Sequence, residues 1–309
     1  MPNETTKLPQ KRQGDVRVPP LRDRDIFALT WIGEQYAIRL DHLQRLLGQR
    51  PGRDTANEDV ISEGAARDVV TRWKKAGWVQ TARIRAHEPF WVWPTRLTLR
   101  KLGLPYAYKD IERSPLKGLE HLAIINEIRL KKCSGSDNIE WRSSRQLLQE
   151  SVRSPDQDLL HLPDAEMRLQ GVGIIAIEAE LSLQKIPELI ENVMELIRGE
   201  GYLQMRAEHG ETRAKKMSQG ERSRYAEIWY FAPPKVRKQI RRACARLVQQ
   251  GDLSPEEADR LSIRWYPLTQ TKEEEAQEKR EDGDGPDPEE SDLDDDDEQG
   301  GEEIIGASP

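Results

Sequence analysis

The chain has 309 residues, of which 33% are charged and 36% hydrophobic, and this length suits two ordinary domains with additional segments. No stretch approaches the roughly 18 consecutive apolar residues of a transmembrane helix, and the polar first residues lack the apolar core of a signal peptide. The spacing of Cys133 and Cys244 argues against a disulfide framework or thiolate zinc site. Neither GxGxxG nor a Walker-type loop is present, so we expect a cytoplasmic protein without a nucleotide or organic cofactor and without a membrane partner.

The charges are unevenly distributed along the chain. The formal net charge is −7, but residues 271–309 alone hold 18 acidic and 3 basic side chains. Residues 1–110 hold 20 basic and 13 acidic side chains, whereas residues 111–270 are nearly balanced. A basic front half predicts a polyanionic partner, and we expect double-stranded DNA.

The first third of the chain has the pattern of a small helical domain. Residues 1–20 are polar and rich in proline, which predicts a flexible arm. Apolar spacing and end signals then predict helices over 24–36, 40–48, 62–76 and 95–102, with strands over 78–85 and 90–93 before the last of them. Three helices followed by a β-hairpin are typical of a winged helix-turn-helix, so we assign residues 21–108 to a winged helix DNA-binding domain.

The predicted third helix has two contrasting faces. Its apolar positions are Ala66, Val69, Val70 and Trp73, and the other face is basic. Such a helix can lie in the major groove, while cations on the hairpin reach phosphates or the minor groove. The candidate DNA-binding residues are Arg67, Thr71, Arg72, Lys74, Lys75, Arg83 and Arg85. The alternative is a winged helix used for protein contacts or dimerisation, with its cations merely solvated.

The second half of the chain predicts an α/β domain. A connecting helix is expected within residues 109–138, and residues 139–268 alternate strands and helices, which indicates a small mixed sheet. Its expected strands cover 139–142, 162–169, 174–181, 224–232 and 262–267, and its helices 144–150, 186–198 and 234–250. The whole chain is thus α+β, with a disordered acidic tail over 269–309.

A predicted hairpin around residue 172 collects carboxylates. A three-residue turn over Gly171–Gly173 makes residues whose numbers add up to 344 face each other. One face is then apolar, and the other gathers four acids: Asp164, Glu166, Glu178 and Glu180. Like charges opposed on strands are destabilising, so we expect a bound cation, raised pKa values or a basic partner. The alternative is an exposed face with solvated or ion-paired acids.

Carboxylates on adjacent strands are suitable ligands for Mg²⁺ or Mn²⁺. The segment also resembles the PD-(D/E)xK nucleases, since Pro163 and Asp164 match the first half of their motif and residues 178–180 occupy the second. Glu180 departs from the family's usual lysine, and Lys185 is the candidate to replace that cation. The resemblance implies metal ligation by Asp164, Glu178 and Glu180 and, with Lys185, a metal-dependent DNA endonuclease that nicks or cleaves.

The order of motifs over about residues 21–248 resembles the replication-relaxation family of plasmid and mobile-element proteins. WKKAGWV, a basic hairpin and WPTRLTLRKLG are followed by LEHLAIINEIRL, WRSSRQL, LPDAEM, IAIEAELSLQK and YAEIWYFAPPKV. Ser144 stands where members often have glutamate. The resemblance implies a DNA-binding accessory protein of replication, relaxation or mobilisation. The alternative is a non-catalytic transcriptional regulator or assembly factor with a degenerate nuclease-like domain, and a homodimer is compatible with either.

The acidic tail has two interpretations. It is a solubilising extension, or its Asp294–Glu298 run competes with DNA for the basic body or docks a basic protein partner. A chain ending near Pro267 decides between them: competition predicts tighter DNA binding at low salt, because a competing polyanion is removed, and a solubilising role predicts unchanged affinity. Fluorescence anisotropy at two salt concentrations measures this, and an unchanged affinity at low salt contradicts competition.

Overall fold

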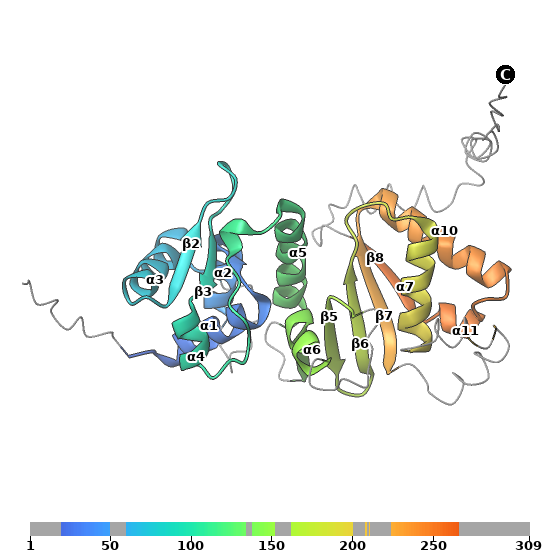
Figure 1. The fold of residues 1–309 in the computed structure, drawn as a ribbon, viewed down its shortest axis with the longest axis horizontal. Coiled ribbons are helices and arrows are strands. Elements are labelled where there is room, and N and C mark those ends of the chain that lie inside the picture. Colours follow the sequence, from blue (N-terminus) through green and yellow to red (C-terminus); the bar gives the residue numbers. More distant parts are fainter. Residues whose placement is uncertain are drawn as a thin grey trace, which may run out of the picture. The chain divides into compact units, whose positions relative to one another are not determined.

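The protein was analysed as a computed structural model that describes residues 20–49, 60–133, 138–151, 162–199, 208, 210 and 224–265. These residues belong to one compact unit. The predicted arm and acidic tail lie outside them, apart from Pro20. The fold is α+β, with one antiparallel and one mixed sheet (Figure 1). Among the helices of these ranges, none is long and apolar enough to cross a membrane.

The N-terminal part consists of helices around a three-stranded sheet. Its elements are α1 (Asp23–Gln35), β1 (Ile38–Arg39), α2 (Leu40–Gly48), α3 (Glu63–Lys75), β2 (Val79–Ala82), β3 (Trp91–Pro94) and α4 (Arg96–Lys101). The strands are antiparallel in the order β1-β3-β2. The sequence did not predict β1, which is only two residues long. The first hairpin strand ends at Ala82, so the expectation that it reaches Arg85 is wrong.

Local signals explain the ends of α3 and α4. The Ser62 hydroxyl accepts a hydrogen bond from the Ala65 amide, as an N-cap does. Gly77 follows α3 with φ +73°, a conformation that favours glycine. Thr95 caps α4 in the same way, through the amide of Thr98. Between these ends, Trp73 and Trp78 are fully buried and form much of the core, as expected.

The second part is built on a five-stranded mixed sheet. Its elements are η1 (Ile111–Arg113), α5 (Leu116–Lys132), β4 (Ile139–Ser143), α6 (Ser144–Ser151), β5 (Ala165–Leu169), β6 (Gly173–Ala179), α7 (Ile186–Arg198), β7 (Tyr225–Ala232), α10 (Pro234–Gln249), α11 (Pro255–Ala258) and β8 (Leu261–Trp265). The order is β4-β5-β6-β7-β8, with antiparallel pairing up to β6 and parallel pairing from β6 to β8. Over the described residues the predicted alternation of strands and helices is confirmed, whereas η1 and α11 were not predicted.

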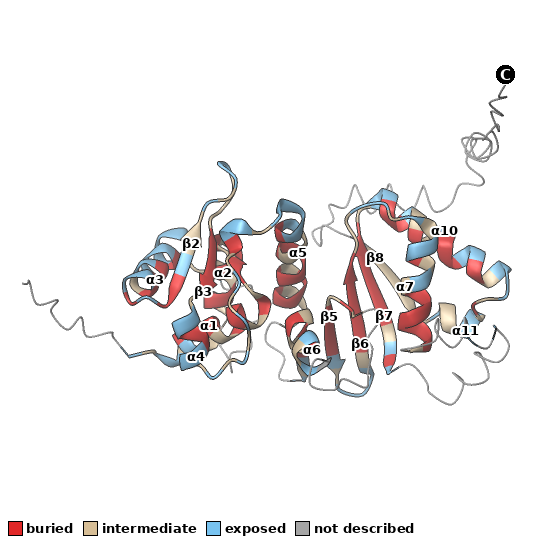
Figure 2. Ribbon diagram, viewed as in Figure 1, coloured by how far each residue is buried: buried red, intermediate tan, exposed pale blue. Residues whose placement is uncertain are grey.

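Both faces of this sheet are covered over its central strands. On one face, Ala176 and Ile228 pack in a core with Val193 of α7 and Ile240 of α10. On the other, α5 contacts β6, and the ammonium of its Lys132 lies over the Trp229 ring. Figure 2 shows the resulting buried strands between these helices. The expectation that one face of the hairpin is apolar and the other polar therefore holds only in part.

The register of the β5–β6 hairpin differs from the prediction by two residues. Leu169 pairs with Gly173 and Ala165 with Ile177, so the three-residue turn is Gln170–Val172. The predicted turn over Gly171–Gly173 is one residue too late. Gly173 instead belongs to β6, where a Cβ would meet Ala226 of β7 at 3.2 Å. Because the shift is even, every side chain keeps its predicted face, but Glu166 lies opposite Ala176 and not opposite Glu178.

The C-terminal end of α1 is held by side chains of the second part. The Arg145 guanidinium, 5% exposed, donates to the carbonyl oxygens of Gly33 and Ala107. The Ser143 hydroxyl donates to the Glu34 carbonyl at 2.7 Å. The Asn126 amide donates to the Ala37 carbonyl at 2.8 Å. Carbonyls at a helix end have no partner within the helix, so these contacts satisfy them and join the two parts.

We predict that Arg145→Lys lowers the free energy of unfolding by about 2 kcal/mol, because an ammonium cannot reproduce the two-pronged contact of the guanidinium. Urea unfolding of the full chain measures the change. Arg113→Lys is the control, since that side chain is 87% exposed and we expect a change below about 0.5 kcal/mol. Equal effects of the two substitutions would refute this role of Arg145.

Candidate functional site

The predicted acidic residues separate into two groups. Asp164 precedes β5 directly, and Glu178 and Glu180 lie at the end of β6, so these three carboxylates meet at one end of the sheet. Glu166, the second residue of β5, lies in a different environment, where Arg142 and Arg224 bind its carboxylate. The structure therefore brings together the three predicted metal ligands and separates them from the fourth acid.

Asp164 is bound by two donors. Its Oδ2 lies 2.9 Å from Nε2 of His121 on α5 and accepts a hydrogen bond from the Ala179 amide at 2.8 Å. Burial lowers the pKa of His121, but the hydrogen bond to Asp164 and the charges of Asp164, Glu178 and Glu180 outweigh it and raise that pKa above its ordinary value. The imidazole is thus favoured as a cation beside the acids.

Glu180 is occupied by the loop that follows it. One of its carboxylate oxygens accepts from the amide of Ser182 at 3.2 Å, and the other accepts from the side-chain amide of Gln184. Burial raises the pKa of Glu180, and the nearby Asp164 charge adds to this effect. The side chain at the position of the nuclease lysine is therefore an acid engaged in local hydrogen bonds.

Tyr230 is the buried neighbour of Glu178. The two residues pair across β6 and β7, and Tyr230 is 3% exposed. Burial and then the Glu178 charge raise the pKa of the Tyr230 hydroxyl well above its usual range. Among the described residues, this hydroxyl has no hydrogen-bond partner. The phenol is therefore neutral and adds polarity, without charge, beside the acids.

Lys185 does not join this group. Its side chain is 82% exposed, and its ammonium lies 3.8 Å from a carboxylate oxygen of Glu188, one turn along α7. It thus extends into solvent and pairs along its own helix. The charge of His121 acts on Asp164 and Glu180, where the sequence predicted a contribution from the lysine.

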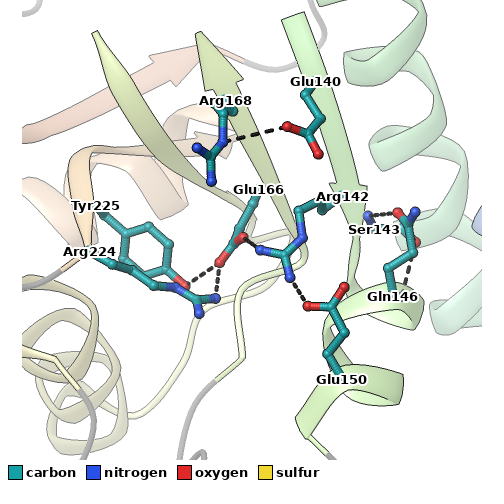
Figure 3. Close-up of polar contacts among 9 residues, drawn as sticks. All are labelled: Glu140, Arg142, Ser143, Gln146, Glu150, Glu166, Arg168, Arg224 and Tyr225. Carbon is teal, nitrogen blue, oxygen red and sulfur yellow. Dashed lines mark hydrogen bonds and ion pairs between the residues drawn. The ribbon is translucent and has the colours of Figure 1, made fainter. Parts of the chain in front are cut away.

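Glu166 is neutralised by basic and phenolic donors (Figure 3). Its side chain is 1% exposed and accepts from Arg142 at 2.6 Å, from Arg224, and from the Tyr225 hydroxyl at 2.9 Å. Arg142 also binds Glu150 of α6. Through these hydrogen bonds the Glu166 carboxylate connects β4, β5 and the start of β7. The expectation that Glu166 shares a cluster with Glu178 is wrong.

Protein donors hold two of the three acids at this end of the sheet. Within the residues that the structure describes, no group of three or more His, Cys, Asp and Glu side chains is arranged to hold a metal ion. Oδ2 of Asp164 and both carboxylate oxygens of Glu180 accept hydrogen bonds from protein donors. These two carboxylates therefore act as hydrogen-bond acceptors for the surrounding chain.

The basic face of α3 is exposed, as its sequence predicts, but several of its cations are paired within the protein. Arg67 binds Glu63 and stacks over the Phe90 ring. Lys74 donates to Thr81 at 3.2 Å. Within the described ranges, Thr71 and Lys75 are exposed without a hydrogen bond or ion pair. The outer surface of α3 therefore has donors that bind other described groups of the protein, Arg67 and Lys74, and donors that do not, Thr71 and Lys75.

Arg72 lies on a different side of α3. Its guanidinium binds Asp25 of α1 at 2.5 Å, and the Trp73 indole donates to the same carboxylate at 3.0 Å. Asp25 is 1% exposed, so this cation compensates a buried charge. Arg72 thus has a structural partner that the sequence pattern did not predict.

Arg83 and Arg85 lie in the loop between β2 and β3. Arg83 donates to the Ala86 carbonyl at 2.8 Å, within the loop itself. Arg85 binds Glu88 and also Glu120 on α5, and these two hydrogen bonds raise its pKa. The contact with Glu120 draws this loop toward α5.

Sequence reasoning missed the role of His121. Spacing along the connecting helix suggests that His121 and Asn126 form a helix-packing pair, but they contact different elements. Asn126 binds the end of α1, and His121 binds Asp164. A contact between residues 43 positions apart has no local signature, so only the packing of α5 against the sheet shows it.

We predict that Glu166→Gln lowers the free energy of unfolding by about 3 kcal/mol or more, because two arginines lose the buried charge that compensates them. Glu140→Gln is the control. Glu140 pairs with Arg168 at 3.5 Å but is 63% exposed, so its loss should cost less than about 1 kcal/mol. Urea unfolding at neutral pH compares them, and a small effect at Glu166 would contradict its structural role.

Comparisons with models of protein families, with curated proteins and with solved structures find no match for this chain.

Proposed function

We propose that the protein binds double-stranded DNA through an N-terminal winged helix, with α3 in the major groove and the β2–β3 loop as its wing. The observation that carries this proposal is the pair of opposite faces on α3. Val70 and Trp73 fix one face in the core, while Thr71, Lys74 and Lys75 remain exposed on the other. A helix supported in this way can present donors to base edges and phosphates without rearrangement.

The order of elements supports the same proposal. The chain order is three helices, with a strand inserted after the first, and then a hairpin, and β1 pairs with β3 of that hairpin. Arg96, Arg100 and Lys101 of α4 are exposed and add to the positive charge of this part. The excess of basic residues in positions 1–110 favours phosphate binding over an uncharged partner.

We further propose that the second part has a PD-(D/E)xK-like arrangement that binds DNA without cleaving it. Three antiparallel strands followed by a helix and a parallel strand, with acids at the β5–β6 end, support the likeness. The glutamate at position 180, the outward Lys185 and the donors that occupy Asp164 favour a non-catalytic role. The resemblance in motif order supports an accessory role in plasmid or mobile-element replication, relaxation or mobilisation.

We predict that Lys75→Gln weakens DNA binding about 3- to 10-fold at low salt and reduces the dependence of log K on log salt by about 1, because one phosphate contact is lost. Anisotropy over a salt series on a labelled duplex measures both quantities. Arg113→Gln, a charge change outside α3 and the wing, is the matched control. Equal losses in the two variants would show that net charge, and not α3, determines binding.

We predict that the wild-type protein binds supercoiled plasmid without nicking or linearising it in Mg²⁺ or Mn²⁺. A gel cleavage assay with binding scored on the same samples tests this, with Asp164→Ala beside the wild type. Cleavage that disappears in Asp164→Ala would overturn the non-catalytic proposal and identify a metal-dependent nuclease. Cleavage that persists in the variant would indicate a contaminating enzyme, and the non-catalytic proposal would stand.

A further inference from the structure

A pocket beside His121 is not explained by duplex binding. It has a volume of about 240 Å³ and lies where the end of α1, the segment around residue 110, α5 and the start of β5 meet. Its lining includes Tyr36, Lys109, Leu119, His121, Ser144 and Asp164. At about 30 Å³ for each water molecule, this is room for roughly eight waters, a volume on the scale of one small organic ligand.

One wall of the pocket is apolar. Leu119 and Ile125 of α5 are each 4% exposed, and Leu122 lies between them on the lining side of the helix. The ring of Tyr36 is also part of the lining. An apolar wall with an aromatic ring beside it favours a flat, poorly hydrated group such as a nucleobase.

The Tyr36 backbone is unusual and is held firmly. Its φ of 73° lies in the left-handed region, where a bulky residue is rare, and no other described non-glycine residue has a positive φ. Arg145 and Lys109 lie over its ring, at 4.4 and 4.8 Å from the ring centre. Strained residues cluster at ligand sites, because the surrounding structure must enforce them.

The polar side of the pocket favours an anion. Lys109 is exposed and belongs to the lining, as does the imidazole of His121. Asp164 is the acid of the lining, and its charge is already bound by His121 and the Ala179 amide. A phosphate can therefore accept hydrogen bonds from the Lys109 ammonium, which lies over the Tyr36 ring, and from Nδ1 of His121, whose Nε2 binds Asp164. Ser144 adds a hydroxyl to the lining.

We propose that this pocket binds a single nucleotide with a phosphate, with the base against Leu119, Leu122 and Tyr36 and the phosphate at Lys109 and His121. The nucleotide is either a free monophosphate or the 5′-phosphorylated end of a DNA strand, since the two share this chemistry. Only the strand-end source rests on the proposed DNA-binding function.

Gly118 allows a sharp test, because it lines the pocket from α5 and a Cβ added there meets no atom within 4 Å. Gly118→Leu therefore adds a bulky side chain at the lining of the pocket without a clash at its Cβ, and it removes a glycine from a helix. Lys109→Gln removes the cation. Lys117→Gln is the matched control, because this neighbouring lysine is exposed and does not line the pocket.

The experiment is calorimetric titration of the full chain with deoxyadenosine monophosphate, with inorganic phosphate, and with a short single strand with or without a 5′-phosphate. We expect the monophosphate to bind the wild type and Lys117→Gln alike and to bind Gly118→Leu and Lys109→Gln about tenfold or more weakly. Preference for the phosphorylated strand over the monophosphate would identify strand ends as the ligand, and the reverse preference would identify free nucleotides. Either preference supports the pocket.

Three results would each overturn the inference. They are unchanged nucleotide binding in Gly118→Leu, no nucleotide binding to the wild type, and equal affinity of the wild type for inorganic phosphate and the monophosphate. Duplex binding is scored on the same samples by anisotropy. If Lys75→Gln weakens duplex binding and leaves nucleotide binding intact, the result bears on the role of α3 and not on the pocket. If Gly118→Leu weakens nucleotide binding and leaves duplex binding intact, the result bears on the pocket and not on α3.

Discussion

The fold depends on which side chains donate hydrogen bonds to the carbonyl oxygens at the C-terminal end of α1. A helix that ends inside a protein leaves carbonyl oxygens that would lose their hydrogen bonds to water. Arg145, Ser143 and Asn126 supply donors to these oxygens from α6, β4 and α5. Arg129 adds an ion pair with Glu34 at 2.6 Å. The N-terminal helices and the mixed sheet therefore share one polar junction, and the turn at Tyr36 and the pocket beside it follow from that junction.

Local patterns predicted most of the elements because each carries its own signal. The apolar face of α3, its cap at Ser62 and its closing glycine are short-range features, and all three are confirmed. β1 was missed because two residues have no periodicity, and it exists only by pairing with β3. The predicted register of the hairpin was wrong because Gly171 and Gly173 are compatible with two different three-residue turns. Gly173 lies in β6, where its close approach to Ala226 leaves little room for a Cβ.

The candidate site was harder to predict, since its chemistry depends on contacts between distant segments. The three acids at the end of the β5–β6 hairpin follow from alternation along the strands. The partners of Asp164 and Glu166 do not, because His121 and Arg224 lie 43 and 58 positions away. The same limit applies to Arg72, whose helix face could be predicted but whose partner Asp25, 47 residues earlier, could not.

The polar junction also defines where the chain can be divided. A fragment that ends at the predicted boundary after residue 108 would keep every strand of the first sheet, yet it would lose the donors that satisfy Gly33, Glu34 and Ala37. It would also expose the residues that pack in one core cluster with Ile111, such as Trp91 and Trp93, and the Trp31 ring that Arg129 covers. An independently folding N-terminal piece should therefore extend through α6, because Ser143 and Arg145 supply the donors to Glu34 and Gly33.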